Sequence, residues 1–124
     1  MDNFKKNLHI RECYPEKNPH ESKVKREYGN KSYKEGKDLD ALYLYTQAVI
    51  AAPVDETTLQ SRDLAVALAN RSAVLFSLKA FNLALDDIRL ALESGYPSEL
   101  RYKLLERKVR DEWTISESGR LNIY

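Results

Sequence analysis

The sequence predicts an all-α fold, built as a short right-handed solenoid of two helix pairs and one capping helix. Apolar residues recur at helical spacing over most of the 124 residues, and no stretch shows the alternation typical of a β-strand. In addition, one spacing of small residues occurs twice. Because 43% of the residues are hydrophobic, a chain of this length can bury the core of one domain.

The first predicted helix follows an N-terminal arm, residues 1–18, which has no clear period and which we expect to be flexible. Asn18 suits the N-cap position, and Pro19 suits the first helical position because a missing N–H there has no intrahelical partner. Gly36 is expected to end this helix in the left-handed conformation.

The second predicted helix has Asp38 as its N-cap and ends at Pro53. The third is expected to be long, from about Thr57 to Lys79, with Asp55 or a nearby threonine as its cap.

The fourth predicted helix covers about residues 81–94 and ends at Gly95. Ser98 is the expected cap of a fifth helix over about residues 99–112. Residues 113–124 show no periodicity and are predicted to form an irregular tail.

The repeated pattern combines small residues, which let paired helices approach closely, with one bulky residue a turn after the first alanine. Its first copy is Gly29, Ala41, Tyr45, Ala48 and Pro53, and its second copy is Ser72, Ala84, Ile88, Ala91 and Pro97. The two copies are 43 residues apart.

This pattern resembles the tetratricopeptide repeat, whose usual period is about 34 residues. We assign the additional residues after Pro53 to a longer third helix. On this interpretation a helical domain covers residues 19–112. It contains repeat 1 at about 22–55, repeat 2 at about 56–97 and the capping helix at about 98–112.

Among tetratricopeptide proteins, the chain most resembles the module of the repeat-bearing branch of SET-and-MYND-domain-containing proteins. It covers residues 22–110 and rests on the local strings at 28–33, 69–73, 95–97 and 104–108. The chain contains no SET cofactor motif, and its one cysteine excludes a zinc-binding cysteine array. Methyl transfer is therefore not carried over, and we expect neither an enzyme nor a cofactor.

One class of tetratricopeptide proteins holds the acidic C-termini of heat-shock chaperones in a carboxylate clamp. The residues that match the clamp are Arg26, Asn30, Asn70, Lys103 and Arg107. The resemblance implies that three cations converge on a terminal carboxylate and an aspartate side chain, while two asparagine amides donate hydrogen bonds. The expected function is an adaptor that binds such peptides in a concave groove.

The chain departs from the pattern at two places. Arg26 stands where the clamp more usually has lysine, and its planar fork changes the geometry of the contact. The third repeat lacks a second helix, so the fifth helix is expected to act as a cap, with Trp113 covering the open end.

Charge is unevenly distributed although the net charge is only +1. Residues 1–37 hold 10 basic and 6 acidic residues, residues 38–100 hold 4 and 9, and residues 101–124 hold 6 and 4. Two basic segments that meet in space would form a cationic patch, in agreement with an acidic ligand. The acidic middle segment argues against nucleic acid as the partner.

Three residues that could serve catalysis or metal binding stand apart from the clamp. Cys13, His9 and His20 have no evident catalytic or metal-binding partners.

The sequence also allows two alternative functions. The first is a structural module, a fragment or truncated relative of a SET/MYND lysine methyltransferase whose groove packs on another domain. The second is scaffold binding through Trp113 and the tail. We expect a monomer rather than a dimer, with no membrane contact, in the cytoplasm and possibly also the nucleus.

Overall fold

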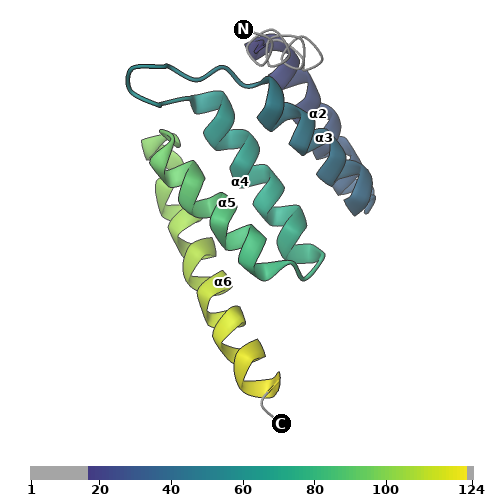
Figure 1. Cartoon of the computed structure of the whole chain (residues 1–124). Helices are drawn as coiled ribbons and strands as arrows, with labels where there is room; N and C mark the ends of the chain where they lie inside the picture. Colours follow the sequence, from purple (N-terminus) through teal and green to yellow (C-terminus); the bar gives the residue numbers. More distant parts are fainter. Residues whose placement is uncertain (1–16, 123–124) are drawn as a thin grey trace, which may run out of the picture.

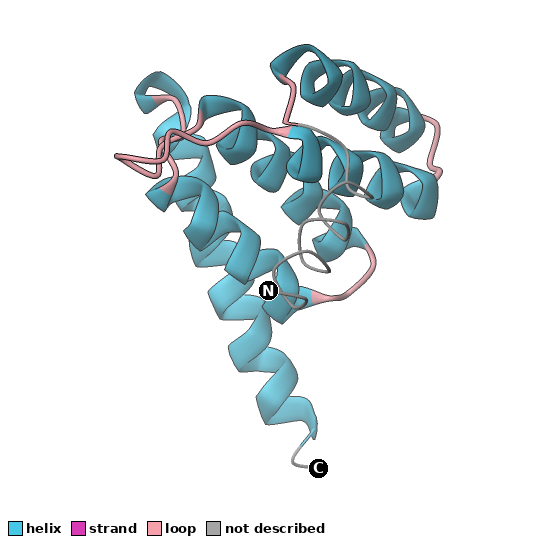
Figure 2. Ribbon diagram, turned by 45° about the horizontal axis from the view of Figure 1, so that its top comes forward, coloured by secondary structure: helices cyan, strands magenta, loops and turns pink. Residues whose placement is uncertain are grey.

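The computed structural model describes residues 17–122, with side chains as far as Gly119. These residues form helices and loops without any strand, so the all-α prediction is confirmed for this part of the chain (Figure 2). The elements are α2 (Pro19–Lys34), α3 (Asp38–Ala51), α4 (Arg62–Ser77), α5 (Phe81–Glu93), the 3-10 turn η1 (Ser98–Leu100) and α6 (Arg101–Asn122). Most of the predicted arm lies outside the described residues.

The helices pack in chain order, as expected of a short helical solenoid. Helix α2 lies against α3, α3 against α4, α4 against α5, and α5 against α6 (Figure 1). Helix α2 also contacts α4, which lies between the first helix pair and the last two helices. As a result, α2, α4 and α6 are the helices that can present a shared face.

The ends of α2 follow the expected chemistry. The Asn18 side chain accepts hydrogen bonds from the backbone N–H groups of His20, at 2.9 Å, and of Glu21, at 3.1 Å. Gly36 has φ 77°, a left-handed conformation that few other residues adopt easily. Both terminal predictions for this helix are confirmed. Asp38, in contrast, is the first residue of α3 rather than its cap.

The third helix is shorter than predicted, because α4 begins at Arg62 and not near Thr57. Asp55 caps a local turn instead, accepting hydrogen bonds from the backbone N–H groups of Thr57 and Thr58 at 2.8 and 3.1 Å. Ser61 is the true cap and accepts from the N–H of Leu64 at 3.0 Å. The additional residues between the repeats therefore form a loop, and the assignment to a longer helix was wrong.

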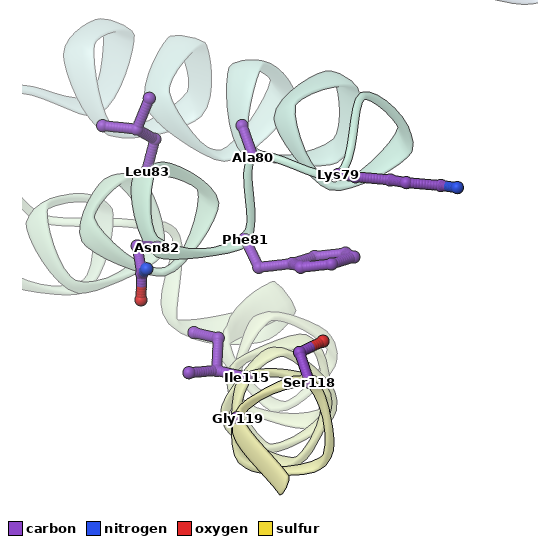
Figure 3. A pocket seen from close by; sticks show the side chains of 8 residues that line it. All are labelled: Lys79, Ala80, Phe81, Asn82, Leu83, Ile115, Ser118 and Gly119. Carbon is purple, nitrogen blue, oxygen red and sulfur yellow. The ribbon is translucent and has the colours of Figure 1, made fainter. Parts of the chain in front are cut away.

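The irregular tail predicted for 113–124 is helical as far as Asn122, the end of α6. Thr114 lies within this helix, and its hydroxyl donates to the carbonyl of Arg110, four residues earlier, at 2.8 Å. Further along, Ile115 and Ser118 face the start of α5 across an open hollow of about 450 Å³ (Figure 3). Trp113 does not cover an end of the solenoid, because 64% of it is exposed.

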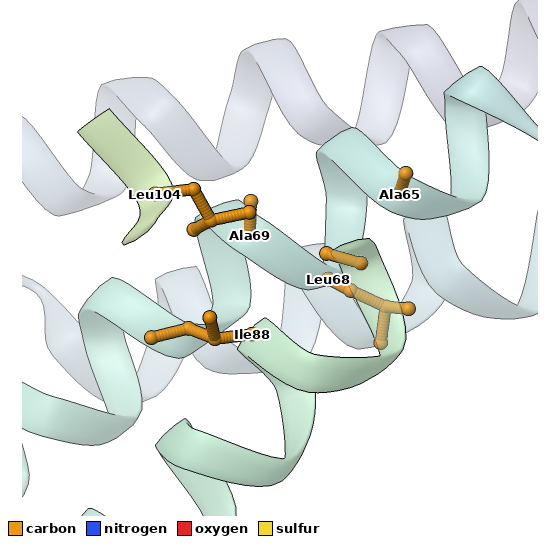
Figure 4. Packing of buried hydrophobic residues seen from close by; sticks show 6 residues of the cluster. Ala65, Leu68, Ala69, Ile88 and Leu104 are labelled. Atoms are coloured by element: carbon orange, nitrogen blue, oxygen red, sulfur yellow. The ribbon is translucent and has the colours of Figure 1, made fainter. Parts of the chain in front are cut away.

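The alanines of the repeated pattern lie in the core. Ala41, Ala48, Ala84 and Ala91 are completely buried, as are Ser72 and Ile88. One cluster joins α4, α5 and α6 around Ile88 and Leu104, with small side chains between them (Figure 4). Small residues at these positions allow the helix axes to approach, which agrees with close packing of helix pairs.

Gly29 makes one such close approach, to Tyr45, and supports a first testable prediction. A methyl group at Gly29 would lie 2.6 Å from two ring carbons of Tyr45, a ring that is 2% exposed and therefore unable to move aside. We expect Gly29→Ala to lower the free energy of unfolding by about 1–3 kcal/mol through overpacking. Chemical denaturation followed by circular dichroism would measure the change.

The matched control is Gly119→Ala in α6, where an added methyl group would meet nothing within 4 Å. That variant should be neutral or more stable by up to about 1 kcal/mol, because alanine is the better helix former. Equal effects at the two glycines would contradict the close packing described for Gly29.

Candidate functional site

The five residues matched to the carboxylate clamp lie on the three alternating helices. Arg26 and Asn30 belong to α2, Asn70 to α4, and Lys103 and Arg107 to α6. The i,i+4 spacing places each pair on α2 and α6 along one helix face. Arg26 contacts Asp63 and Arg107 contacts Ala69, so these two cations, from α2 and from α6, both lie against α4.

Arg107 lies half-buried against α4. Its Nη2 atom donates to the Ala69 carbonyl at 2.8 Å and to the hydroxyl of Ser72. Burial lowers the pKa of Arg107, and the neighbouring Arg110 lowers it further. Among the described residues no carboxylate forms an ion pair with it, so its hydrogen-bond acceptors are neutral. The charge of Asp111, four residues later in α6, acts against the lowering of the Arg107 pKa.

Arg26 is engaged by an acidic residue of the protein itself. Its Nη2 atom lies 3.4 Å from Oδ1 of Asp63 in the first turn of α4. The Nε atom of Arg26 is buried and has no hydrogen-bond partner among the described residues. Arg26 therefore uses little of its capacity to donate hydrogen bonds.

Asn30 is oriented by Tyr45 of α3. The Tyr45 hydroxyl donates to Oδ1 of Asn30 at 2.5 Å. Burial raises the pKa of Tyr45 to about 12, so the hydroxyl keeps its proton and remains a donor at physiological pH. With its oxygen occupied, Asn30 offers its amide nitrogen as a donor.

Asn70 and Lys103 complete the set without strong contacts of their own. Asn70 is partly buried on α4, and no hydrogen bond of its side chain is found within the described part of the chain. Lys103 is exposed, and its Nζ atom lies 5.9 Å from the centre of the Tyr102 ring. Both side chains are available to an incoming acceptor.

Two residues of this face were not predicted. Asp63 lies seven positions before Asn70, which is two helical turns, and this spacing could have shown that it shares the face of α4. Arg110 stacks on the Phe76 ring at 3.7 Å and donates to Oδ1 of Asp111 at 3.1 and 3.2 Å. The spacing of residues within α6 could not predict this contact, because the Phe76 ring belongs to another helix.

The side chains that could serve catalysis or bind a metal ion are scattered in the described part of the chain. No three His, Cys, Asp or Glu side chains there are arranged to hold a metal ion, and no helix there is long and apolar enough to cross a membrane. Cys13 and His9 lie outside this part of the chain, and His20 is exposed in the first turn of α2.

The relatives come from one group of vertebrate proteins. Comparison with family models and with solved structures finds no match. The chain is similar to one part of Protein-lysine N-methyltransferase SMYD4. It is 39% identical to the chicken (Gallus gallus) protein over 93 residues, 75% of this chain. It is 37% identical to zebrafish (Danio rerio) SMYD4 over 108 residues, 86% of this chain.

Human (Homo sapiens) SMYD4 is 36% identical over 84 residues, 68% of this chain. These matches cover 12%, 14% and 10% of the chicken, zebrafish and human SMYD4 chains. The chain is therefore similar to a small portion of SMYD4 and spans 10–14% of the length of these proteins. This similarity supports the predicted link to SET-and-MYND-domain proteins, and the helical fold is compatible with tetratricopeptide repeats.

Proposed function

We propose that the chain is a non-catalytic protein-recognition module that binds acidic C-terminal peptides on the face formed by α2, α4 and α6. The observation that carries the proposal is Arg107, a half-buried cation without an ion-pair partner among the described residues. A buried charge is costly unless it is paired, so an incoming carboxylate would stabilise it.

The neighbouring donors fit the same ligand. Asn30 and Asn70 offer amide N–H groups, and Lys103 offers an exposed ammonium group. A terminal carboxylate with an aspartate side chain beside it accepts several such bonds at once. By the resemblance to clamp-type repeats, the partner we propose is a heat-shock chaperone, met in the cytoplasm or the nucleus.

A peptide titration by fluorescence polarisation tests the proposal. A labelled short peptide that ends in aspartate with a free carboxylate should bind in the micromolar range, and salt should weaken the binding. Amidation of the C-terminus should weaken binding by about tenfold or more, since one charge-assisted contact contributes about 1.5–3 kcal/mol. Lys103→Ala should weaken it about three- to fivefold, because Lys103 is exposed and its contact is screened.

Arg89→Ala is the matched control, since it removes one exposed positive charge from α5 instead of from the proposed site. Its affinity should equal that of the wild type. The proposal is wrong if amidation and Lys103→Ala both leave the affinity unchanged, or if no acidic peptide binds.

A second candidate function is supported by the relatives. Because the chain spans only 10–14% of the SMYD4 proteins, the same face could pack on another part of such a protein. A zebrafish SMYD4 fragment that lacks the matching residues would then bind this chain in trans, and acidic peptides would not compete. Competition by the peptide would favour the first function.

A further inference from the structure

The contact between Arg26 and Asp63 differs from an ordinary structural ion pair. A single distance of 3.4 Å joins Nη2 to Oδ1, whereas charge-assisted hydrogen bonds are usually about 2.7–2.9 Å long. The Arg26 side chain is 20% exposed and that of Asp63 is 31% exposed, so both can be reached by a ligand.

A structural ion pair is available for comparison in the same molecule. Arg71 of α4 donates from Nε and from Nη2 to the two oxygens of Asp87 in α5, both at 2.8 Å. The Asp87 side chain is only 5% exposed. Arg71 thus satisfies its partner with two aligned bonds, while Arg26 makes one long contact and leaves its buried Nε without a partner among the described residues.

We propose that Asp63 is an internal competitor that occupies Arg26 in place of a ligand carboxylate and thereby sets which acidic peptides bind. This inference rests on the proposed function of the same face. A ligand carboxylate that displaces Asp63 can form the paired contact with Arg26 that Asp63 does not form. Asp63 then turns toward solvent, to which it is already partly exposed.

In this arrangement Asp63 weakens the binding of ligands with two carboxylates more than that of ligands with one. Arg107 forms no ion pair within the described residues, since Asp111, four residues later, is hydrogen-bonded to Arg110. The first carboxylate therefore binds at Arg107, and Asp63 does not oppose it. The second carboxylate gains Arg26 only by displacing Asp63. A peptide with a single carboxylate binds at Arg107 and is affected less by Asp63.

The test is Asp63→Asn in the whole chain, titrated with two labelled peptides. The first peptide ends in aspartate, so its terminal residue carries two carboxylates. The second ends in asparagine, so its terminal residue carries only the main-chain carboxylate. Asp63→Asn should raise the affinity for the first peptide roughly two- to fivefold, the range expected when a partly exposed ion pair is removed. The affinity for the second peptide should rise less. Thermal unfolding of Asp63→Asn, and of Asp63→Ser as a second variant, verifies that α4 remains folded.

Two controls separate direct competition from a general charge effect. Asp86→Asn removes one exposed negative charge from α5, away from Arg26, and should leave both affinities unchanged. In an Arg26→Gln background, Asp63→Asn should lose its effect.

The outcomes distinguish a failure of Asp63 as a competitor from a failure of peptide binding itself. If the wild type binds the peptide and Asp63→Asn binds equally or more weakly, Asp63 positions Arg26 and the competitor inference is wrong. An equal gain for Asp86→Asn would also overturn it. If neither the wild type nor any variant binds either peptide, the proposed function fails, and the inference fails with it.

Discussion

Leu104→Ala should lower the free energy of unfolding by about 3 kcal/mol. Leu104 is 1% exposed and joins α6 to a cluster with Ile88. Its other neighbours there include Ala65, Ala69 and Ala91, and such small side chains cannot move to fill the space that a lost leucine leaves. Denaturant unfolding followed by circular dichroism would measure the loss.

The adjacent Leu105 provides the control for this variant. It is 42% exposed, so Leu105→Ala should change the free energy of unfolding by less than about 0.5 kcal/mol. Similar losses for the two leucines would show that α6 does not pack on α4 and α5 through Leu104. Because Lys103 and Arg107 flank Leu104 on α6, a large loss would also disturb the proposed binding face.

Arg71→Met is expected to be comparably severe, with a loss of about 3 kcal/mol. The substitution keeps an unbranched side chain but removes both hydrogen bonds to Asp87, which is 3% exposed as a residue. The Asp87 carboxylate then stays buried between α4 and α5 without a counter-charge, and this is the main cost. The bonds to Asp87 are also the largest cause of the raised pKa of Arg71.

The double variant Arg71→Met/Asp87→Leu tests the cause of that loss. It removes the unpaired carboxylate together with its partner, so much of the stability should return. Arg89→Met on the exposed side of α5 should have almost no effect. If the double variant is as unstable as Arg71→Met, lost packing rather than an unpaired charge explains the result.

The helical architecture was predictable because its main determinants are local. Asn18, Gly36 and Gly95 act through their own backbone conformation or their own cap. The small residues at 41, 48, 84 and 91 carry a spacing that a sequence shows directly, and the structure buries all of them.

The loop before α4 and the end of α6 were not predictable in the same way. Asp55 and Ser61 are both good caps, and only the structure shows that Ser61 begins the helix. The residues after Glu112 show no periodicity, yet they continue α6 as far as Asn122, and Ile115 lies opposite the start of α5. Contacts with another element decide such cases, because local propensity is a weak determinant.

The helices that carry the candidate site residues were predictable from the sequence, but the partners of the two arginines were not. The Arg26–Asp63 contact joins residues 37 positions apart, and the Arg107 contact with Ala69 joins residues 38 apart. Ser72 was expected only as a small packing residue, yet its hydroxyl accepts from Arg107. Such contacts depend on how the helices stack, which spacing within one helix does not show.

The linear order of helix packing has a consequence for cooperativity. Helix α2 packs on α3 and α4, while α6 packs mainly on α5, so the two ends of the molecule are connected through α4. In such an array the stability of each unit depends on its nearest neighbours, and the ends can open separately. A ligand held by α2 and α6 together would add a contact between the ends, and unfolding of the whole array would become more nearly all-or-none.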